Sequence, residues 1–362
     1  MSRTLRLALT STVLAATLAA CGGTEGGSDD TTTDDTTSTD DDGASADATG
    51  GDGTVTLYSG RNEDLVQPVI DQFTEATGIE VEVRYAGTAE MAAQLLEEGE
   101  NSPAEAFLAQ DAGALGAVAA GGLLQELPQE TLDAVPETFR SADGTWVGLT
   151  GRSRVLVYNK DLVSEDELPA SVDELTEPQW EGRVGLAPTN ASFQAFITAM
   201  RVLEGDDAAT SWMADMAAND PQLREGNGPI VADVEAGTMD AGLVNHYYLY
   251  EVAQEQGVEV EDLGSALHFF SEGDTGALVN ISGIGMVGEQ ADGEAQLLID
   301  HLLSTEGQTY FVEETSEYPM IEGLGAPEGL PALEELQTPE IDLNDLEDLQ
   351  TTVQMITESG LL

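Results

Sequence analysis

The chain has 362 residues, of which 69 are acidic and 11 basic, so its formal net charge at pH 7 is −58. A field of that sign repels nucleic acid, which excludes nucleic acid as a binding partner. The single cysteine, Cys21, excludes an internal disulfide. The acidity has two interpretations, a surface that gathers cations or the carboxylate-rich surface of a salt-adapted protein, and such charge bears on solubility more directly than on a site.

The N-terminus has the pattern of a bacterial lipoprotein signal. Arg3 and Arg6 precede a short apolar run, and small residues lead up to Cys21. The run is shorter than the about 20 apolar residues that a membrane span needs. We therefore predict a signal peptide over residues 1–20 and lipidation of Cys21, which would anchor the mature protein at the extracytoplasmic face of the cell membrane. A chance cysteine in a leader sequence is the alternative.

Residues 21–53 consist mainly of Gly, Ser, Thr, Ala and Asp, with almost nothing that could join a core. Such a segment self-repels and stays disordered, so we predict an acidic tether between membrane and domain. From Thr54 onward apolar and polar residues mix as in a globular protein. The roughly 310 residues that remain are enough for two lobes of ordinary size.

The first part of this body alternates between strand and helix patterns. Leu65, Val69 and Phe73 follow helical spacing, and Gly78 closes that segment. The predicted elements are a strand over 54–60, a helix over 62–77, a strand over 79–85, a helix over 89–98 and a strand over 106–108. This β-α-β-α-β order predicts a parallel sheet with helices on both faces.

The pattern resumes further along the chain. The predicted elements are strands over 153–158, 183–187 and 241–244, and helices over 193–203 and 210–218. A loop rich in Gly, Pro and Glu over 323–337 precedes two predicted C-terminal helices. The predicted fold class is therefore α/β, with two doubly wound lobes joined by a hinge and the ligand in the crevice outside the strand ends.

Tyr247 and Tyr248 follow the apolar run Ala241 to Val244, which predicts a buried strand that emerges at a loop. A phenol ionises near pH ~10, but a bound trivalent cation can remove its proton at neutral pH because the metal's charge dominates the local electrostatics. Two adjacent hydroxyls in this place suit a hard metal ion. The dipeptide by itself also fits two ordinary half-buried aromatic residues.

Five segments form a fairly specific combination in chain order. They are Leu57-Tyr58-Ser59-Gly60-Arg61, Ser102 to Phe107, Gly182 to Gly185 followed by Pro188 to Phe193, Val244 to Tyr248, and Glu317-Tyr318-Pro319. With them the chain resembles the substrate-binding proteins of bacterial ABC importers, specifically the ferric-ion-binding group with a transferrin-like, two-lobe fold (type II periplasmic binding proteins). The resemblance spans essentially all of the body.

The resemblance implies that Tyr247 and Tyr248 supply two phenolate oxygens to ferric iron, Fe(3+), the transported ligand. The same family commonly adds a histidine and a glutamate, and the corresponding positions here are Asn62 and Gln110. Both are neutral amides, whose carbonyl oxygens bind weakly and whose nitrogens are not ligands. Either anions and water fill the vacated positions, or the ligand is not bare iron. The neighbours Glu63 and Asp111 are substitutes if the register differs by one residue.

An anion site is the second expectation. Asn190, Ala191 and Ser192 precede a predicted helix, so free backbone N–H groups would face an anion there. The resemblance places carbonate or phosphate at these three residues as the synergistic anion, with Asn227 and Asn245 also reaching it. A plain helix cap is the alternative.

Two arginines are further candidates for the anion. Arg61 and Arg152 have the planar fork that suits carbonate or a carboxylate. Surface ion pairing is the alternative for Arg152. His246 stands beside the tyrosines, but on a strand its side chain would point away from Tyr247, so we expect a structural or supporting role. His268 and His301 occur alone and at no metal-ligand spacing.

The sequence contains no nucleophile elbow, zinc-protease motif or phosphate loop. We therefore predict a monomeric, lipid-anchored binding protein, not an enzyme, which closes around ferric iron and a synergistic anion and delivers the iron to the permease and ATPase of an ABC importer. One alternative is a receptor for another small anion or an iron chelate, such as a phosphonate, sulfate or citrate complex. The other is an exported hydrolase that uses two carboxylates.

The predicted lobes are each built from two stretches of chain. The N-terminal lobe comprises residues 54–152 and 278–325, and the C-terminal lobe comprises 153–277 and 326–362. The hinge is expected near residues 150–153 and 278–283.

Overall fold

The computed structural model describes residues 53–362 except 272, 289, 290, 292 and 337. The predicted signal peptide, the lipidated Cys21 and all but the last residue of the predicted tether lie outside the described residues. None of the described helices combines the length and apolar character that crossing a bilayer requires.

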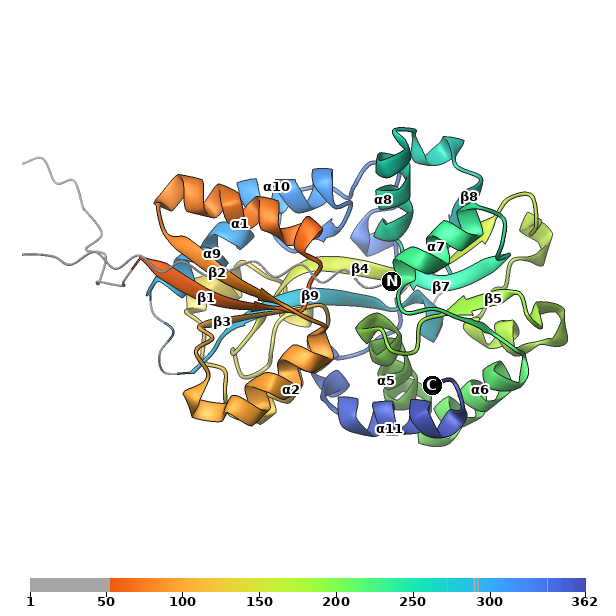
Figure 1. Ribbon diagram of the computed structural model, residues 1–362, viewed down its shortest axis with the longest axis horizontal. Coiled ribbons are helices and arrows are strands. Elements are labelled where there is room, and N and C mark those ends of the chain that lie inside the picture. Colours follow the sequence, from red (N-terminus) through yellow and green to blue (C-terminus); the bar gives the residue numbers. More distant parts are fainter. Residues whose placement is uncertain (1–52, 272, 289–290, 292, 337) are drawn as a thin grey trace, which may run out of the picture. The chain divides into compact units, whose positions relative to one another are not determined.

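The N-terminal part of the described chain forms three parallel strands with helices on either side, α1 above them and α2 below in Figure 1. β1 (Thr54–Ser59) pairs in parallel with both β2 (Glu80–Tyr85) and β3 (Ala106–Ala109). The helices of this part are α1 (Glu63–Thr77), α2 (Thr88–Glu98), α3 (Ala112–Ala120) and α4 (Gln129–Asp133). The predicted β-α-β-α-β unit and its parallel pairing are confirmed.

The first helix shows why the local pattern was informative. The apolar side chains of α1, among them Leu65, Val69 and Phe73, recur at helical spacing and are buried. Gly78 ends the helix with φ of 79°, a left-handed conformation that glycine adopts without steric cost.

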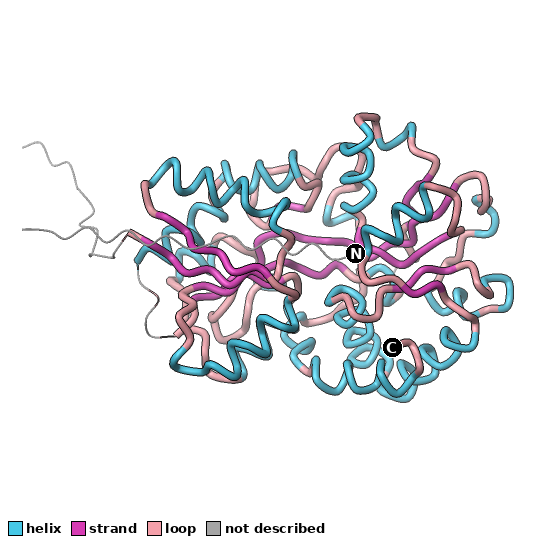
Figure 2. Tube along the Cα trace, viewed as in Figure 1, coloured by secondary structure: helices cyan, strands magenta, loops and turns pink. Residues whose placement is uncertain are grey.

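Two long antiparallel strands join this part to the rest of the sheet. β4 (Val147–Asn159) and β9 (Val279–Met286) are buried along their whole length. The first half of β4 pairs with β9, and its second half pairs with β7 and β8. The sheet order is β2-β1-β3-β9-β4-β7-β5-β6, so the strands form one continuous mixed sheet (Figure 2).

The second part of the sheet is covered by α7 on one side and by α5, α6 and α11 on the other (Figure 1). Its strands are β5 (Val184–Leu186), β6 (Gln222–Leu223), β7 (Ala241–Asn245) and β8 (Ser265–His268). Its helices are α5 (Ala191–Glu204), α6 (Asp206–Ala218), α7 (Asn227–Glu235) and α8 (Tyr247–Gln256).

The C-terminal stretch returns to both parts of the sheet. α9 (Gly293–Leu303) contacts α1 and β1, α10 (Thr305–Glu314) and β10 (Tyr318–Pro319) contact β4, and α11 (Leu349–Ser359) packs on α5 and α6. Short 3-10 helices occupy Gly99–Asn101, Glu137–Phe139, Glu165–Glu167, Val172–Thr176, Pro178–Trp180, Val260–Asp262, Thr275–Ala277, Leu333–Glu335 and Leu343–Glu347. The exact lobe boundaries stay a prediction.

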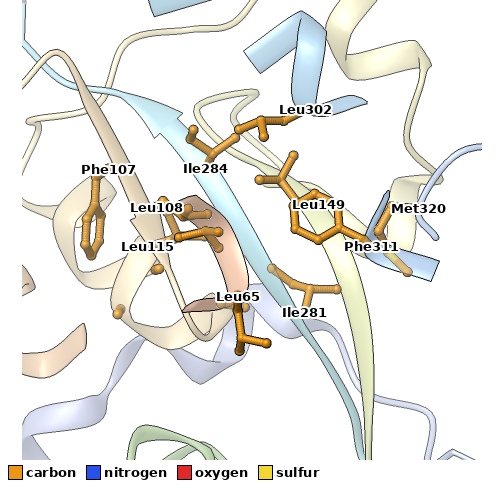
Figure 3. Packing of buried hydrophobic residues seen from close by; sticks show 14 of the residues in the cluster. Leu65, Phe107, Leu108, Leu115, Leu149, Ile281, Ile284, Leu302, Phe311 and Met320 are labelled. Atoms are coloured by element: carbon orange, nitrogen blue, oxygen red, sulfur yellow. The ribbon is translucent and has the colours of Figure 1, made fainter. Parts of the chain in front are cut away.

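The core beside β4 and β9 contains side chains from both strands and from the helices α3, α9 and α10. Figure 3 shows Leu149 of β4 and Ile284 of β9 between Leu302 of α9 and Leu115 of α3, with Phe311 of α10 nearby. These side chains are all buried. Because helices from distant parts of the sequence cover the two crossing strands, the strands are held by packing from both sides.

Two sequence-based expectations are wrong. The strand before the tyrosine pair does not emerge at a loop; the pair begins α8, because the backbone is already helical at His246. The predicted pair of C-terminal helices is one helix, α11, preceded by the short 3-10 helix at Leu343–Glu347. Asp348 separates the two and accepts a hydrogen bond from the N–H of Thr351, as an N-cap does.

Candidate functional site

The tyrosine pair lies where β7 passes into α8. The rings of Tyr247 and Tyr248 are stacked, with centroids 4.3 Å apart and planes inclined by 27°. Both side chains are buried. Burial raises the pKa of both phenols above the ordinary value. Each phenol therefore keeps its proton at neutral pH.

A cleft of about 610 Å³ lies beside the pair at Gln110, and residues from five segments of the chain line it. Asn62, Gln110, Asn190 and Ala191 all line it. The Gln110 Nε2 group also donates a hydrogen bond to the Tyr247 hydroxyl at 3.4 Å. Asn62 is exposed and makes no capping hydrogen bond to α1. The two amides at the expected ligand positions thus lie at the cleft, and Gln110 contacts Tyr247.

Arg61 is committed to a buried ion pair. Its Nη1 and Nη2 donate to the two carboxylate oxygens of Glu317 at 2.9 and 2.7 Å. Thr150 and Thr315 each donate a further hydrogen bond to that carboxylate at 3.1 Å. Burial acts to raise the pKa of Glu317, but the Arg61 guanidinium outweighs it and the pKa is lowered. The Arg61 guanidinium, which was expected to bind an anion, therefore binds a carboxylate of the chain itself. Its central carbon lies 5.9 Å from the ring centroid of Tyr247.

Arg152 is buried but only partly paired. Its Nη2 donates to the Ile281 carbonyl at 3.0 Å, whereas Nε and Nη1 have no hydrogen-bond partner among the described residues. Surface ion pairing, the alternative for Arg152, is wrong because the side chain is 1% exposed. Burial lowers the pKa of its guanidinium, and the nearby charge of Arg61 lowers it further.

Asp111 belongs to the same buried group. Its Oδ1 caps α3 by accepting from the Ala114 N–H at 2.9 Å, and its Oδ2 has no partner within the described part of the chain. Burial raises the pKa of this carboxyl, and Arg152 acts against the rise. Asp111 therefore stands beside Arg152 as a helix cap, and Gln110, not Asp111, contacts the tyrosines.

The N-terminus of α5 carries the polar cluster expected for an anion. Asn190 caps the helix by accepting from the Ser192 N–H at 3.0 Å. The Ser192 hydroxyl donates to Asn190 Oδ1 at 2.7 Å and accepts from Asn227 Nδ2 at 3.0 Å. The plain cap is thus present, together with a second helix N-terminus, that of α7, which begins at Asn227. Asn245, the last residue of β7, is buried and pairs with Arg154 in the β4–β7 ladder.

Arg154 is a charged member of this cluster that the sequence analysis missed. Its Nη1 donates to the Ser192 hydroxyl at 3.1 Å and its Nη2 to the Leu243 carbonyl at 3.1 Å. It is fully buried and has no carboxylate partner within the described residues, and burial lowers its pKa to about 9. The signal was available, because Arg152 and Arg154 stand two apart on one face of an otherwise apolar strand.

The three histidines differ in their surroundings. His246 is completely buried, lies edge-on to the Tyr247 ring at 5.9 Å, and has its pKa lowered to about 4 by burial. The prediction that it points away from Tyr247 along a strand is wrong, since His246 directly precedes α8 and its backbone is already helical. His268 bonds the Pro169 carbonyl, and His301 packs against Phe73. Across the described residues, no three His, Cys, Asp or Glu side chains are grouped so as to hold a metal ion.

These observations agree with what is known of similar proteins. Residues 101–346 match the family described as bacterial extracellular solute-binding protein. The Fe(3+)-binding periplasmic protein of Serratia marcescens is 33% identical over 319 residues, which cover 88% of this chain and 93% of that relative. The chain belongs to the bacterial extracellular solute-binding proteins.

Solved structures place this solute-binding protein in the same fold. Iron-bound HitA from Pseudomonas aeruginosa matches with a TM-score of 0.79 at 32% identity, covering 85% of this chain and 99% of that one. A Trichodesmium protein solved with iron and citrate ligands matches with a TM-score of 0.71 at 27% identity, again over 85% and 99%. The predicted fold class, two α/β lobes of the type II periplasmic binding proteins, is confirmed.

Proposed function

We propose that this solute-binding protein captures ferric iron outside the cytoplasm with the phenolates of Tyr247 and Tyr248 and a synergistic anion, and delivers it to an ABC importer. The observation that carries the proposal is the buried, stacked tyrosine pair beside a polar cleft. Phenolate oxygens are hard, charged donors that suit a hard trivalent ion. The names of the Serratia and Pseudomonas proteins, which refer to Fe(3+) binding and to bound iron, support it.

The charges around the pair are the argument for the anion. Two phenolates leave one positive charge on ferric iron, and Gln110 and Asn62 add no negative charge. Arg152 and Arg154 are buried nearby, and no carboxylate of the described residues is hydrogen-bonded to either, although Asp111 and Glu317 act on the charge of Arg152. Buried positive charge without a hydrogen-bonded counter-charge is costly, so carbonate or phosphate would be bound together with the metal. Asn190, Ala191, Ser192, Asn227 and Asn245 are the proposed contacts to that anion, together with Arg152.

Capture would involve closure of the two lobes about the crossing strands. β4 and β9 are the long strands shared by both parts of the sheet, and they contain the predicted hinge segments. Gln110 already contacts Tyr247, and because the ligand positions come from both parts, closure would bring Asn62 toward the tyrosines and would exclude water. A monomer working with a permease and an ATPase is the proposed form.

The lipid anchor completes the proposal. Acylation requires the thiol of Cys21, and the charge of the chain does not favour binding to anionic lipids. Fractionation of cells that express the Cys21→Ser variant tests this point. We expect the variant in the soluble fraction, and a variant that still sediments with membranes would contradict lipid anchoring.

The deciding experiment is a titration of metal-free protein with ferric citrate, followed by visible absorbance. Tyrosinate bound to ferric iron gives a charge-transfer band, which Tyr247→Phe and Tyr248→Phe should weaken while lowering the affinity more than tenfold, about 1.4 kcal/mol. The matched control is Tyr158→Phe, because Tyr158 is also buried but lies on β4 within a separate apolar cluster. Equal affinity in all three variants would reject the assignment.

A second candidate is an iron chelate as the ligand. The cleft of about 610 Å³ is large for a bare ion, and the two amides leave coordination positions open. Mass spectrometry of the intact complex under native conditions separates the two, since a retained citrate mass indicates a chelate. Calorimetric binding of sulfate or a phosphonate without iron would favour the metal-free alternative instead.

A further inference from the structure

His246 occupies an unusual place between the sheet and the tyrosine pair. Its ring is completely buried, and both nitrogens are hydrogen-bonded to backbone. Nδ1 accepts from the Ser153 N–H at 3.1 Å, and Nε2 lies 2.8 Å from the Ser316 carbonyl oxygen. An N–H donor faces Nδ1 and a carbonyl faces Nε2, so the proton is carried on Nε2. A single neutral side chain thus satisfies two buried backbone groups.

The two backbone partners belong to different segments. Ser153 lies on β4, near the point where this strand changes partners from β9 to β7. The His246 N–H also donates to the Ser153 carbonyl at 3.1 Å, so these two residues are joined twice. Side chain and backbone together fix the first residue before α8 to the strand on which the two parts of the sheet meet.

Ser316 is the second partner and has a rare backbone. Its φ is 53°, and Asp220 is the one other non-glycine residue with positive φ in the described ranges. Such a conformation is strained for a residue with a side chain and persists when its surroundings hold it. His246 holds the Ser316 carbonyl, and the next residue, Glu317, is held by Arg61. The turn is therefore fixed on both sides.

The same ring also packs against the site. It lies edge-on to Tyr247, with centroids 5.9 Å apart and planes at 87°, and 5.1 Å from Tyr318. We propose that His246 is a positioning residue that ties the tyrosine pair to the strand crossing and to the Ser316 turn, so that the direction of the phenol oxygens depends on its two hydrogen bonds. This inference rests on the proposed iron-binding function. It adds a residue that orients the two tyrosine ligands.

The competing explanation is that His246 only stabilises the fold. That explanation predicts a less stable iron-free protein with an unchanged metal site. Positioning predicts a changed site, because a phenol that turns by a small angle alters its overlap with the metal and its distance from it. The charge-transfer band and the rate of iron loss separate the two explanations.

The test compares three substitutions at this position. His246→Phe keeps an aromatic ring and removes both hydrogen bonds, His246→Gln can supply one acceptor and one donor, and His246→Asn is too short to reach both partners. The control is His268→Phe. His268 likewise bonds a backbone carbonyl, that of Pro169, and packs on Phe270, but it is the last residue of β8 and has neither tyrosine among these contacts. The measurements are the visible band of the ferric protein, the rate of iron transfer to EDTA, and thermal unfolding without iron.

We expect His246→Phe to shift the band and to speed iron loss at least tenfold, and His246→Gln to restore the band and a rate within threefold of the unmodified protein. His268→Phe should lower the unfolding temperature and leave band and rate unchanged. If His246→Phe does not fold, His246→Asn decides, and it must differ from His246→Gln in band and rate. The inference is overturned if His246→Phe has the same band and the same rate of iron loss as the unmodified protein. If His246→Phe does not fold, the same result in His246→Asn overturns it. Absence of any band in the unmodified protein would instead reject the iron proposal.

Discussion

Two buried arginines beside the tyrosine pair have opposite surroundings. Arg61 places both terminal nitrogens on the two oxygens of Glu317, and two threonines complete that carboxylate. Arg152 is equally buried, yet its Nε and Nη1 lack partners among the residues that the structure describes. Arg61 is bound by both oxygens of a carboxylate of the chain, whereas Arg152 retains capacity to donate.

The difference assigns the two residues to different tasks. A buried ion pair with all its hydrogen bonds made is a structural element, since removing either partner leaves an uncompensated charge. A buried guanidinium with free donors is costly to the fold and is explained by a ligand that completes it. We therefore retain Arg152 as a proposed anion contact and regard Arg61 as the partner that fixes Glu317 beside the site.

Breaking the satisfied pair should have the largest effect. Glu317→Gln keeps the shape of the side chain but leaves Arg61 buried without its counter-charge. We expect the free energy of unfolding to fall by about 3–5 kcal/mol, measured by chemical denaturation of the iron-free protein.

A partly exposed ion pair of the same chain is the control. Arg183 Nε contacts Asp240 at 2.6 Å with both side chains about a quarter exposed. Asp240→Asn should cost less than about 1 kcal/mol. Similar losses in the two variants would mean that burial does not distinguish the Arg61–Glu317 pair.

Changing Arg152 should weaken iron binding more than it weakens the fold. Arg152→Met removes a buried charge that lacks a bonded carboxylate, so we expect the free energy of unfolding to change by less than about 1 kcal/mol or to rise. Iron binding in the presence of bicarbonate should weaken more than tenfold, about 1.4 kcal/mol, because the anion loses its donors. Denaturation and competition with citrate measure the two quantities. A variant that loses as much stability as Glu317→Gln and no affinity would show that Arg152 is structural.

Much of the fold was predictable because its elements are encoded locally. The spacing of Leu65, Val69 and Phe73 and the closing Gly78 fixed the position of α1 to within a residue. The pairing of β3 with β9 and of β4 with β9 was not predictable, because it joins segments more than 100 residues apart. Non-local pairing depends on the whole set of packed elements, which no local period reports.

The candidate residues of the site stand out in the sequence, whereas their geometry does not. The pair Tyr247 and Tyr248 and the cluster from Asn190 to Ser192 stand out as sequence, and the structure places them at or beside one cleft. The roles of Arg154, Glu317 and His246 depend on burial and on partners far along the chain. The step from strand to helix at His246 decides the direction of its ring, and boundaries of elements are the least certain part of a pattern.

The neutral amide at Gln110 offers a finer test of the same charge argument. Gln110→Glu adds a negative oxygen donor 3.4 Å from the Tyr247 hydroxyl, if the carboxylate takes the place of the amide. We expect the dependence of iron affinity on bicarbonate to fall severalfold, because the metal then needs less charge from the anion. The measurement is competition with citrate at low and high bicarbonate. An unchanged dependence would point to another carboxylate, such as Glu63 at the cleft, as the ligand.

The smallest expected effect concerns Glu251, whose pKa responds to the charge of Glu317 although Glu317 is paired with Arg61. Glu251 lies one turn along α8 from the tyrosines, half-buried, and its pKa is raised to about 7, first by burial and then by Glu317, with Glu255 and Asp64 adding to the rise and Arg61 opposing it. The unfolded carboxyl titrates near 4.5. Between these values the folded state binds more protons than the unfolded state, so this group makes the protein less stable as the pH rises from about 4.5 to about 7.

Glu251→Gln removes that titration and should therefore stabilise the iron-free protein only where Glu251 is charged. We expect a gain of about 1–2 kcal/mol in the free energy of unfolding at pH 8, below the full value of the pKa shift because the side chain is partly solvated, and no gain at pH 4.5. The control is Glu255→Gln, one turn further along α8 and exposed, which should change stability by less than about 0.5 kcal/mol at both pH values. An equal gain at both pH values would show that packing, not charge, separates the variants. Glu251→Gln should give a smaller gain in a protein that already carries Glu317→Gln, because the repulsion between the two carboxylates is then absent. That result would confirm that the charge of Glu317 acts on Glu251 despite its pairing with Arg61.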